Sequence, residues 1–161
     1  MSDFDRAAAI VLRLEGGETD DPDDPGGHTR FGISATHHPD VDIAALTRPE
    51  ALAIYRRDYW DALKCDELPW PLAVTAFDIN VNQGGGFAAR ALQRAVGAKV
   101  DGIIGPLTVA SATHHPDPAW VLTTLTRMRI QRYHARSKAQ HINGHLNRAI
   151  QVHAAAVRGS H

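Results

Sequence analysis

The stretch Arg13–Ser34, RLEGGETDDPDDPGGHTRFGIS, decides how the chain is organised, because it cannot form part of a long helix. Two Asp-Pro steps and two Gly-Gly pairs make it rich in turns. It carries six carboxylates between Glu15 and Asp24, then closes on an aromatic-Gly-Ile run. The sequence therefore predicts a helix that ends here, an acidic loop, and in residues 28–34 a short strand of a small β hairpin.

Helical patterns lie on both sides of this stretch. The first 15 residues place Phe4, Ala7, Ala8, Val11 and Leu14 at helical spacing, and Gly16-Gly17 would stop that helix. In residues 46–63, Thr47 and Glu50 form a capping box with Pro49 in the first turn. Further helices are predicted over residues 71–86, which ends at the glycine triplet Gly84–Gly86, and over 87–97, 106–112, 117–140 and 145–157. The predicted class is mainly α, with one small β hairpin near the N-terminus.

Composition narrows the class of protein. The chain has 161 residues, of which 43% are hydrophobic, so we expect one domain with a real core. Lys and Arg number 17 against 18 Asp and Glu, so the total charge offers no electrostatic reason to predict a nucleic-acid binder. Cys65 is the only cysteine, which excludes an internal disulfide.

The ends of the chain also carry information. The N-terminal residues bear acids where a signal peptide needs positive charge, and no stretch approaches the length of a membrane span. We therefore expect a protein made in the cytoplasm without a signal peptide and with no membrane insertion. Residues 158–161 resemble the start of an engineered affinity tag and are set aside from the functional reasoning.

Two features invite a metal interpretation. The acidic loop fails the EF-hand pattern, because a loop starting at Asp21 has Pro25 at its fifth position and Gly32 at its twelfth. A looser calcium or magnesium site stays open. The motif ATHHPD occurs twice, at 35–40 and 112–117, but its paired histidines lack a spaced third ligand. A turn closed by proline, with Asp117 capping the next helix, explains it better.

A charged loop exposed to solvent does not explain the position of one of these acids, Glu15. It is predicted at the C-terminal end of the first helix, where the helix dipole disfavours an ionised carboxylate. Neighbouring carboxylates and partial burial act in the same direction. A carboxyl kept protonated near neutral pH is what a glycosidase needs as its general acid. The second carboxylate that such enzymes require is available several times over in the same loop.

Several motifs, in order, resemble one family. EGG at 15–17, followed by DPDDPGGHTRFGIS at 21–34, is similar to the N-terminal signature of glycoside hydrolase family 108, the N-acetylmuramidases of phages and bacteria. AFDINVNQGG and ALQRAVGAKVDGIIGPLT resemble its C-terminal region, often called a peptidoglycan-binding domain, and NGHLNR at 143–148 resembles its closing motif. The resemblance spans most of the chain and implies a lysozyme-like helical fold.

The resemblance implies roles for single residues. The family's catalytic glutamate falls on Glu15, and a looser similarity to phage-type lysozymes implies Asp24 as second carboxylate and Thr29 as a residue that positions water. Asp20, Asp21 and Asp23 remain alternatives to Asp24. Two departures from the family stand out: Glu18 replaces the usual aromatic after EGG, and His145 replaces the usual tryptophan of the closing motif.

Substrate contacts are predicted in the second half. Side-chain amides suit the acetamido and hydroxyl groups of amino sugars, since each offers a donor and an acceptor. The candidates are Asn80, Asn82 and Gln83, with Tyr59 as an aromatic that could line a sugar cleft. We expect one lysozyme-like domain of two lobes, a catalytic lobe over about residues 1–70 and a peptidoglycan-binding-like lobe over about residues 71–157, since the chain is too short for two good independent cores.

The resemblance implies a monomeric N-acetylmuramidase that cleaves the β-1,4 bond between N-acetylmuramic acid and N-acetylglucosamine in peptidoglycan glycan strands. It implies a phage or prophage endolysin that leaves the cytoplasm through a holin and acts on the cell wall, or a muramidase that serves secretion. Such hydrolysis uses carboxylates and water and needs no cofactor or metal. Alternatives are a non-catalytic peptidoglycan-binding module, which would need no general acid, and an amidase or endopeptidase, which would use zinc or a Cys-His pair.

Overall fold

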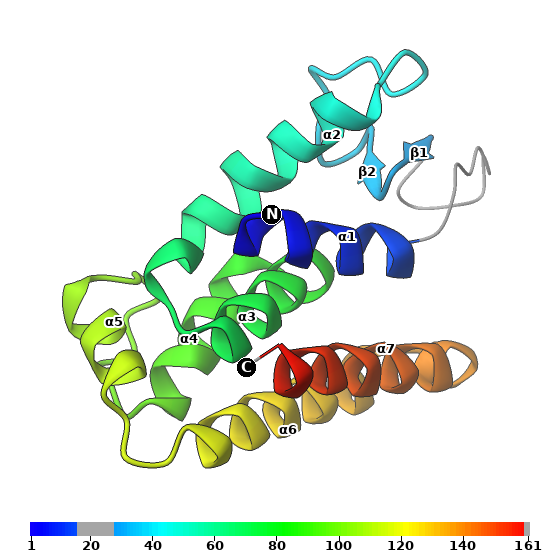
Figure 1. Cartoon of the computed structure of the whole chain (residues 1–161). Coiled ribbons are helices and arrows are strands. Elements are labelled where there is room, and N and C mark those ends of the chain that lie inside the picture. Colours follow the sequence, from blue (N-terminus) through cyan, green and yellow to red (C-terminus); the bar gives the residue numbers. More distant parts are fainter. Residues whose placement is uncertain (16–27, 160–161) are drawn as a thin grey trace. The chain divides into compact units, whose positions relative to one another are not determined.

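The computed structural model of the chain describes residues 1–15 and 28–159. It divides into two compact units, Met1–Asp58 and Tyr59–His161, and each unit has its own internal packing. Helices dominate both units, and the strands of the described residues form one two-stranded antiparallel hairpin near the N-terminus (Figure 1). The predicted mainly α class with one small β hairpin is confirmed.

The first unit begins with α1, Asp3–Glu15, as predicted. Its buried face consists of Phe4, Ala7, Ala8 and Val11. The guanidinium of Arg56 lies 5.2 Å from the centre of the Phe4 ring and so covers the start of this face. Glu15 is the last residue of the helix, while the predicted stop at Gly16-Gly17 lies outside the described residues.

The hairpin is tighter than the sequence suggested. Strands β1, Thr29–Arg30, and β2, Ile33–Ser34, pair antiparallel, so both strands lie inside the segment that was predicted as one. The two residues between them, Phe31 and Gly32, have φ angles of 52° and 75°. Positive φ at both central positions is what a two-residue type I′ turn requires, and this turn folds the segment back on itself.

The second helix of this unit, α2, covers Arg48–Ile54 and has the predicted capping box. The Glu50 carboxylate accepts a hydrogen bond from the Thr47 backbone N–H at 2.8 Å. The predicted helix over 46–63 does not continue as an α-helix, because a π-helical segment, Tyr55–Trp60, and a 3₁₀ turn, Asp61–Leu63, follow. A π turn holds an extra residue, so the regular α-helical spacing on which the prediction relied does not continue after Ile54.

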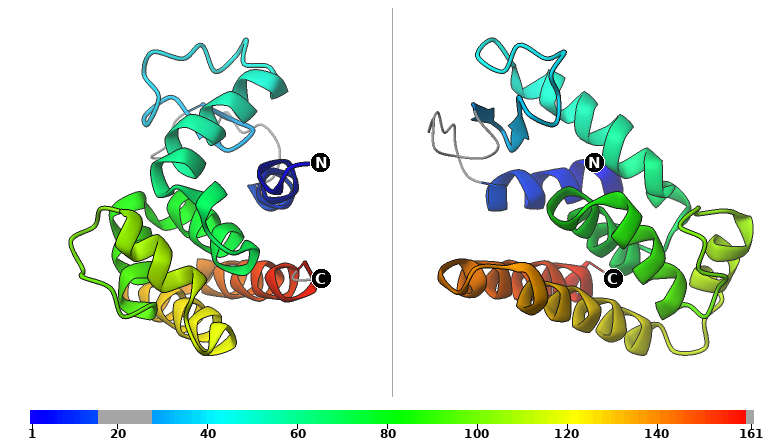
Figure 2. Two further views of the ribbon diagram at one scale, coloured as in Figure 1. Left: turned by 60° about the vertical axis from the view of Figure 1, so that its left-hand side comes forward. Right: turned by 180° about the vertical axis from the view of Figure 1, so that it is seen from behind.

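The second unit is a helical bundle around α3. After a 3₁₀ turn at Cys65–Glu67 come five helices: α3, Trp70–Gln83; α4, Gly85–Ala95; α5, Pro106–Thr113; α6, Pro118–Arg136; and α7, Ala139–Arg158. Helix α3 is buried over most of its length and packs against α4, α6 and α7. Both views of Figure 2 show α6 and α7 side by side, joined by a short connection.

Helix ends in this unit follow local signals in some places and tertiary contacts in others. Helix α3 ends before the glycine triplet, as predicted, and Asp117 caps α6 by accepting a hydrogen bond from the Trp120 N–H at 2.9 Å. The prediction that this helix reaches residue 140 is wrong, because it ends at Arg136 and Ser137 has extended backbone angles. The Ser137 hydroxyl bonds the His145 ring at 2.7 Å, which ties the connection to α7.

No helix among the described residues combines the length and the apolar character that a membrane span requires.

Candidate active site

Glu15 lies against the turn of the β hairpin. A Cβ atom added to Gly32 would lie 2.8 Å from the Glu15 Cγ and 2.4 Å from the Tyr55 hydroxyl oxygen. Both distances are shorter than any ordinary contact, so only a glycine fits between these side chains. The Glu15 side chain therefore packs onto the hairpin backbone, half-buried, at the C-terminal end of α1.

Tyr55 joins this cluster from the first residue of the π-helical segment. It is 1% exposed, and its hydroxyl donates a hydrogen bond to the Phe31 carbonyl at 2.9 Å. Phe31 is a bulky residue with positive φ, which is rare and is maintained only where the surrounding structure compensates for the strain. The Tyr55 bond supplies part of that compensation, and it fixes the turn on which Glu15 rests.

The other predicted catalytic residues divide into two groups. Thr29 is described: it is half-buried, it opens β1, and it pairs with Ser34 across the hairpin. It therefore belongs to the same hairpin whose turn contacts Glu15. Asp24 lies outside the described residues, as do its alternatives Asp20, Asp21 and Asp23.

The predicted substrate-binding residues all lie in the second unit. The Asn80 amide donates to the Tyr59 carbonyl at 2.9 Å, and Asn80 is only 5% exposed. Tyr59 itself is half-buried in the π-helical segment. Asn82 and Gln83 are half-buried at the end of α3: Asn82 accepts from the Tyr133 hydroxyl at 2.5 Å, and Gln83 donates to the Arg129 carbonyl at 3.2 Å.

A buried cluster of charged side chains lies around α3 near these amides. Asp78 is 0% exposed on α3 and bonds Arg148 of α7, with contacts of 2.7 and 3.0 Å, as well as Arg129 of α6. Arg129 also donates to the Tyr133 hydroxyl at 3.0 Å. Burial raises the pKa of Tyr133, so this hydroxyl stays protonated and can donate to Asn82. One carboxylate thus joins three helices and orients the end of α3.

The second ATHHPD copy and one departure from the family, His145, have structural explanations, while the other departure, Glu18, lies outside the described residues. In the second ATHHPD copy, the His115 ring stacks on Trp120 with 5.8 Å between ring centres. Among residues 1–15 and 28–159, no three His, Cys, Asp or Glu side chains converge to hold a metal ion. His145 stacks on Tyr133 with 4.6 Å between ring centres, so it takes a packing position.

Sequence reasoning missed Gly32 and Tyr55 as neighbours of Glu15. The aromatic-Gly-Ile run was the available signal for Gly32, since a glycine after a large residue between two short strands suits a tight turn. Tyr55 lies within the predicted helix over residues 46–63, and it is buried. Nothing in its spacing indicated that its hydroxyl would reach a turn 24 residues earlier in the chain.

Comparison with known proteins now bears on this site. A search of the curated proteins found no match. The solved structure of SagA from Brucella abortus is similar to this chain, with a TM-score of 0.87 and 29% sequence identity over 98% of this chain and 95% of that one. Residues 8–84, which include Glu15, the hairpin, Tyr55 and α3, match the family model of glycosyl hydrolase 108, and this match supports a glycoside hydrolase.

Proposed function

We propose that the chain is an N-acetylmuramidase that hydrolyses the β-1,4 bond between N-acetylmuramic acid and N-acetylglucosamine in peptidoglycan. One observation carries the proposal: Glu15 lies at the end of α1 with its side chain against the hairpin turn, inside the segment that matches glycosyl hydrolase 108. A carboxyl group rigidly placed by backbone is what general acid catalysis requires.

The proposed roles follow the chemistry of glycoside hydrolysis. Glu15 protonates the leaving glycosidic oxygen while Asp24 acts on the opposite face of the sugar, either as an electrostatic partner or as base for the attacking water. Thr29 positions that water through its hydroxyl. The oxocarbenium-like transition state needs no group beyond these carboxylates and water, so the proposed reaction runs without a cofactor.

Residues at the end of α3 are proposed to bind the glycan. Asn82 and Gln83 are half-buried, and each has further hydrogen-bonding capacity beyond the bond described above. Asn80 and Tyr59 are bonded to each other through the Asn80 amide, so they support this end of α3 as well as belonging to the proposed binding set. The proposed biological setting is a phage or prophage endolysin, acting as a monomer on the cell wall after holin-dependent release.

The test is a digest of purified peptidoglycan with the fragments read by mass spectrometry. The unaltered chain should release muropeptides with reducing muramic acid ends, and Glu15→Gln should release none, since an amide N–H is far too weak an acid to protonate the glycosidic oxygen. Glu67→Gln is the matched control: Glu67 is an exposed acid whose ion pair with Lys64 is long, at 3.8 Å. It should cut at the rate of the unaltered chain.

Other outcomes would reject the proposal. Fragments with cut peptide bonds or freed amines would show that a different bond is hydrolysed. Cleavage by Glu15→Gln at the rate of the Glu67→Gln control would remove Glu15 from the reaction. Binding to peptidoglycan with no cleavage by the unaltered chain would indicate a binding module.

A further inference from the structure

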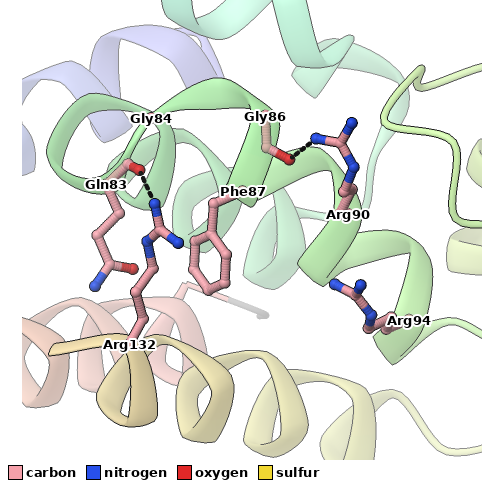
Figure 3. Close-up of a pocket in the computed structure, with 7 residues that line it drawn as sticks. All are labelled: Gln83, Gly84, Gly86, Phe87, Arg90, Arg94 and Arg132. Atoms are coloured by element: carbon pink, nitrogen blue, oxygen red, sulfur yellow. Dashed lines mark hydrogen bonds between the residues drawn. The ribbon is translucent and has the colours of Figure 1, made fainter. Parts of the chain in front are cut away.

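The second unit contains an open hollow lined by three arginines. It has a volume of about 420 Å³ and is formed where the end of α3, helix α4 and the C-terminal part of α6 meet. Figure 3 shows its lining residues: Gln83, Gly84, Gly86, Phe87, Arg90, Arg94 and Arg132. No acidic residue is among them, so the charge of the hollow is positive.

Two of the three guanidinium groups, those of Arg132 and Arg90, are held in place by neighbouring groups. Arg132 lies over the Phe87 ring at 4.3 Å and donates to the Gln83 carbonyl at 3.3 Å. Arg90 donates to the Gly86 carbonyl at 2.9 Å (Figure 3). Arg94 follows Arg90 by four residues on α4 and therefore lies on the same side of that helix. Cations fixed in advance lose less entropy when they bind an anion.

A loop that contains Gly102 also contacts the Arg90 guanidinium. A Cβ atom added to Gly102 would lie 3.1 Å from the Arg90 Cζ, so the guanidinium rests on the Gly102 backbone. Gln93, which is 1% exposed, accepts from the Gly102 N–H at 2.8 Å and donates to the Ile103 carbonyl at 3.0 Å. A buried amide therefore fixes the loop that supports one wall of the hollow.

The acids in the sequence after Trp70 are bonded to groups other than these three arginines. From Trp70 to the end, the sequence has ten Lys or Arg and only three Asp. Asp78 is buried between two other arginines, Asp101 bonds Gln93 and the Ile103 N–H, and Asp117 caps α6. Within the part of the chain that the structure describes, no ion pair joins Arg90, Arg94 or Arg132 to a carboxylate. Burial and the neighbouring Arg136 cation lower the pKa of Arg132, which is the effect of a site without a negative partner.

We infer that this hollow binds carboxylate groups of the peptide stems of peptidoglycan. Guanidinium groups bind carboxylates through paired N–H donors, and the first turn of α4 adds backbone donors and the positive end of a helix dipole at the same place. The Phe87 ring beside Arg132 offers an apolar surface for the small side chains between stem carboxylates. This inference rests on the proposed function, because it assigns a binding site to the same polymer.

The test measures binding separately from cleavage. The Glu15→Gln chain is sedimented with sacculi that carry peptide stems and no teichoic acid, and with glycan strands from the same sacculi after enzymatic removal of the stems. Into this background we introduce Arg90→Gln with Arg94→Gln. The matched control is Arg127→Gln with Lys138→Gln, two exposed cations outside the hollow with the same change in charge.

The expected result is specific to the stems. The hollow variant should bind intact sacculi about tenfold more weakly than the control, as loss of charge-assisted hydrogen bonds implies, and bind bare glycan equally well. A single Arg94→Glu change should weaken sacculus binding too, and Arg94 makes no described side-chain contact whose loss would unfold the chain. Equal binding of both variants to intact sacculi would overturn the inference.

Two further outcomes identify a different anion. If the hollow variant loses binding to bare glycan as strongly as to intact sacculi, the arginines do not recognise stems. If DNA or inorganic phosphate competes for the hollow more strongly than stem peptide does, the ligand is a phosphate and the inference fails. Cleavage assays decide the proposed function independently, since the Arg90 and Arg94 substitutions leave Glu15 and its hairpin unchanged.

Discussion

Replacement of Gly32 by alanine tests whether close contact with the hairpin turn positions Glu15. The change has two costs. Alanine at a φ of 75° costs about 1–2 kcal/mol relative to the ordinary helical region, partly offset by the lower entropy of its unfolded chain. The new methyl group also meets the Tyr55 hydroxyl at 2.4 Å and the Glu15 Cγ at 2.8 Å, so one or both must move.

Gly97 offers a matched control for the first cost. Its φ is 70°, and a Cβ atom added there would have nothing within 4 Å. Gly97→Ala should therefore lose only the backbone contribution, about 1 kcal/mol in the free energy of unfolding. Gly32→Ala should lose a further ~1–3 kcal/mol, the usual cost of forcing an extra methyl group into a packed site.

Activity should separate the two variants more clearly than stability. Restoring an ordinary contact at Gly32→Ala requires the Glu15 side chain to move by about half an ångström or more, and displacements on this scale reduce rates by roughly tenfold to a hundredfold. Gly97→Ala should cut peptidoglycan at the unaltered rate. The measurements are urea unfolding followed by circular dichroism, and the initial rate of muropeptide release at a temperature where both variants are folded.

A further variant distinguishes the two contacts. Adding Tyr55→Phe to Gly32→Ala removes the hydroxyl that the methyl group meets, so part of the lost stability should return, measured against Tyr55→Phe alone. The rate should stay low, because the contact with Glu15 remains. If Gly32→Ala is no less stable and no less active than Gly97→Ala, the packing of Glu15 against the turn has no part in catalysis and the reasoning is refuted.

Three other perturbations address the second unit. Asp78→Asn should lower the free energy of unfolding by about 3–5 kcal/mol in urea titrations, because it leaves Arg129 buried without its counter-charge, and a loss below 1 kcal/mol would contradict that role. Gln93→Leu keeps the side-chain volume but leaves the Gly102 N–H without its hydrogen-bond acceptor. Hydrogen exchange of the Gly102 amide should therefore become faster, while exchange along α7 stays unchanged. Burial and nearby cations lower the pKa of His145, so the folded protein resists protonation of this ring. The free energy of unfolding should therefore fall as the pH drops below about 6.5, the pKa in the unfolded chain. In unfolding curves from pH 7.5 to 5, His145→Phe should make this fall smaller.

The sequence by itself determined the helices that carry strong local signals. The capping box of Thr47 and Glu50, the Asp117 cap and the glycine triplet each set a helix end through interactions between residues a few positions apart. The same local logic placed Glu15 at the end of α1. These predictions succeeded because capping depends on backbone groups within one turn.

Tertiary structure decided the features that join distant segments. The type I′ turn at Phe31 is maintained with the help of a hydroxyl 24 residues away, and the π-helical segment that supplies this hydroxyl interrupts a stretch whose local pattern predicted a plain helix. Asp78 meets arginines 51 and 70 residues further along the chain. Helical periodicity cannot report such partners, because it records which face is buried and not what covers it.

The arginine hollow shows the difference most clearly. The whole chain has a net charge of −1, a value that gave no reason to expect a cationic site. The fold brings Arg90 and Arg94 of α4 together with Arg132 of α6, while the three acids of the same region are bonded elsewhere. Local sequence determined several helix ends, although α7 begins at Ala139 and not at the predicted residue 145. Only the packing of α4 against α6 decided which charges share one surface, since electrostatic sites depend on distance in space and not along the chain.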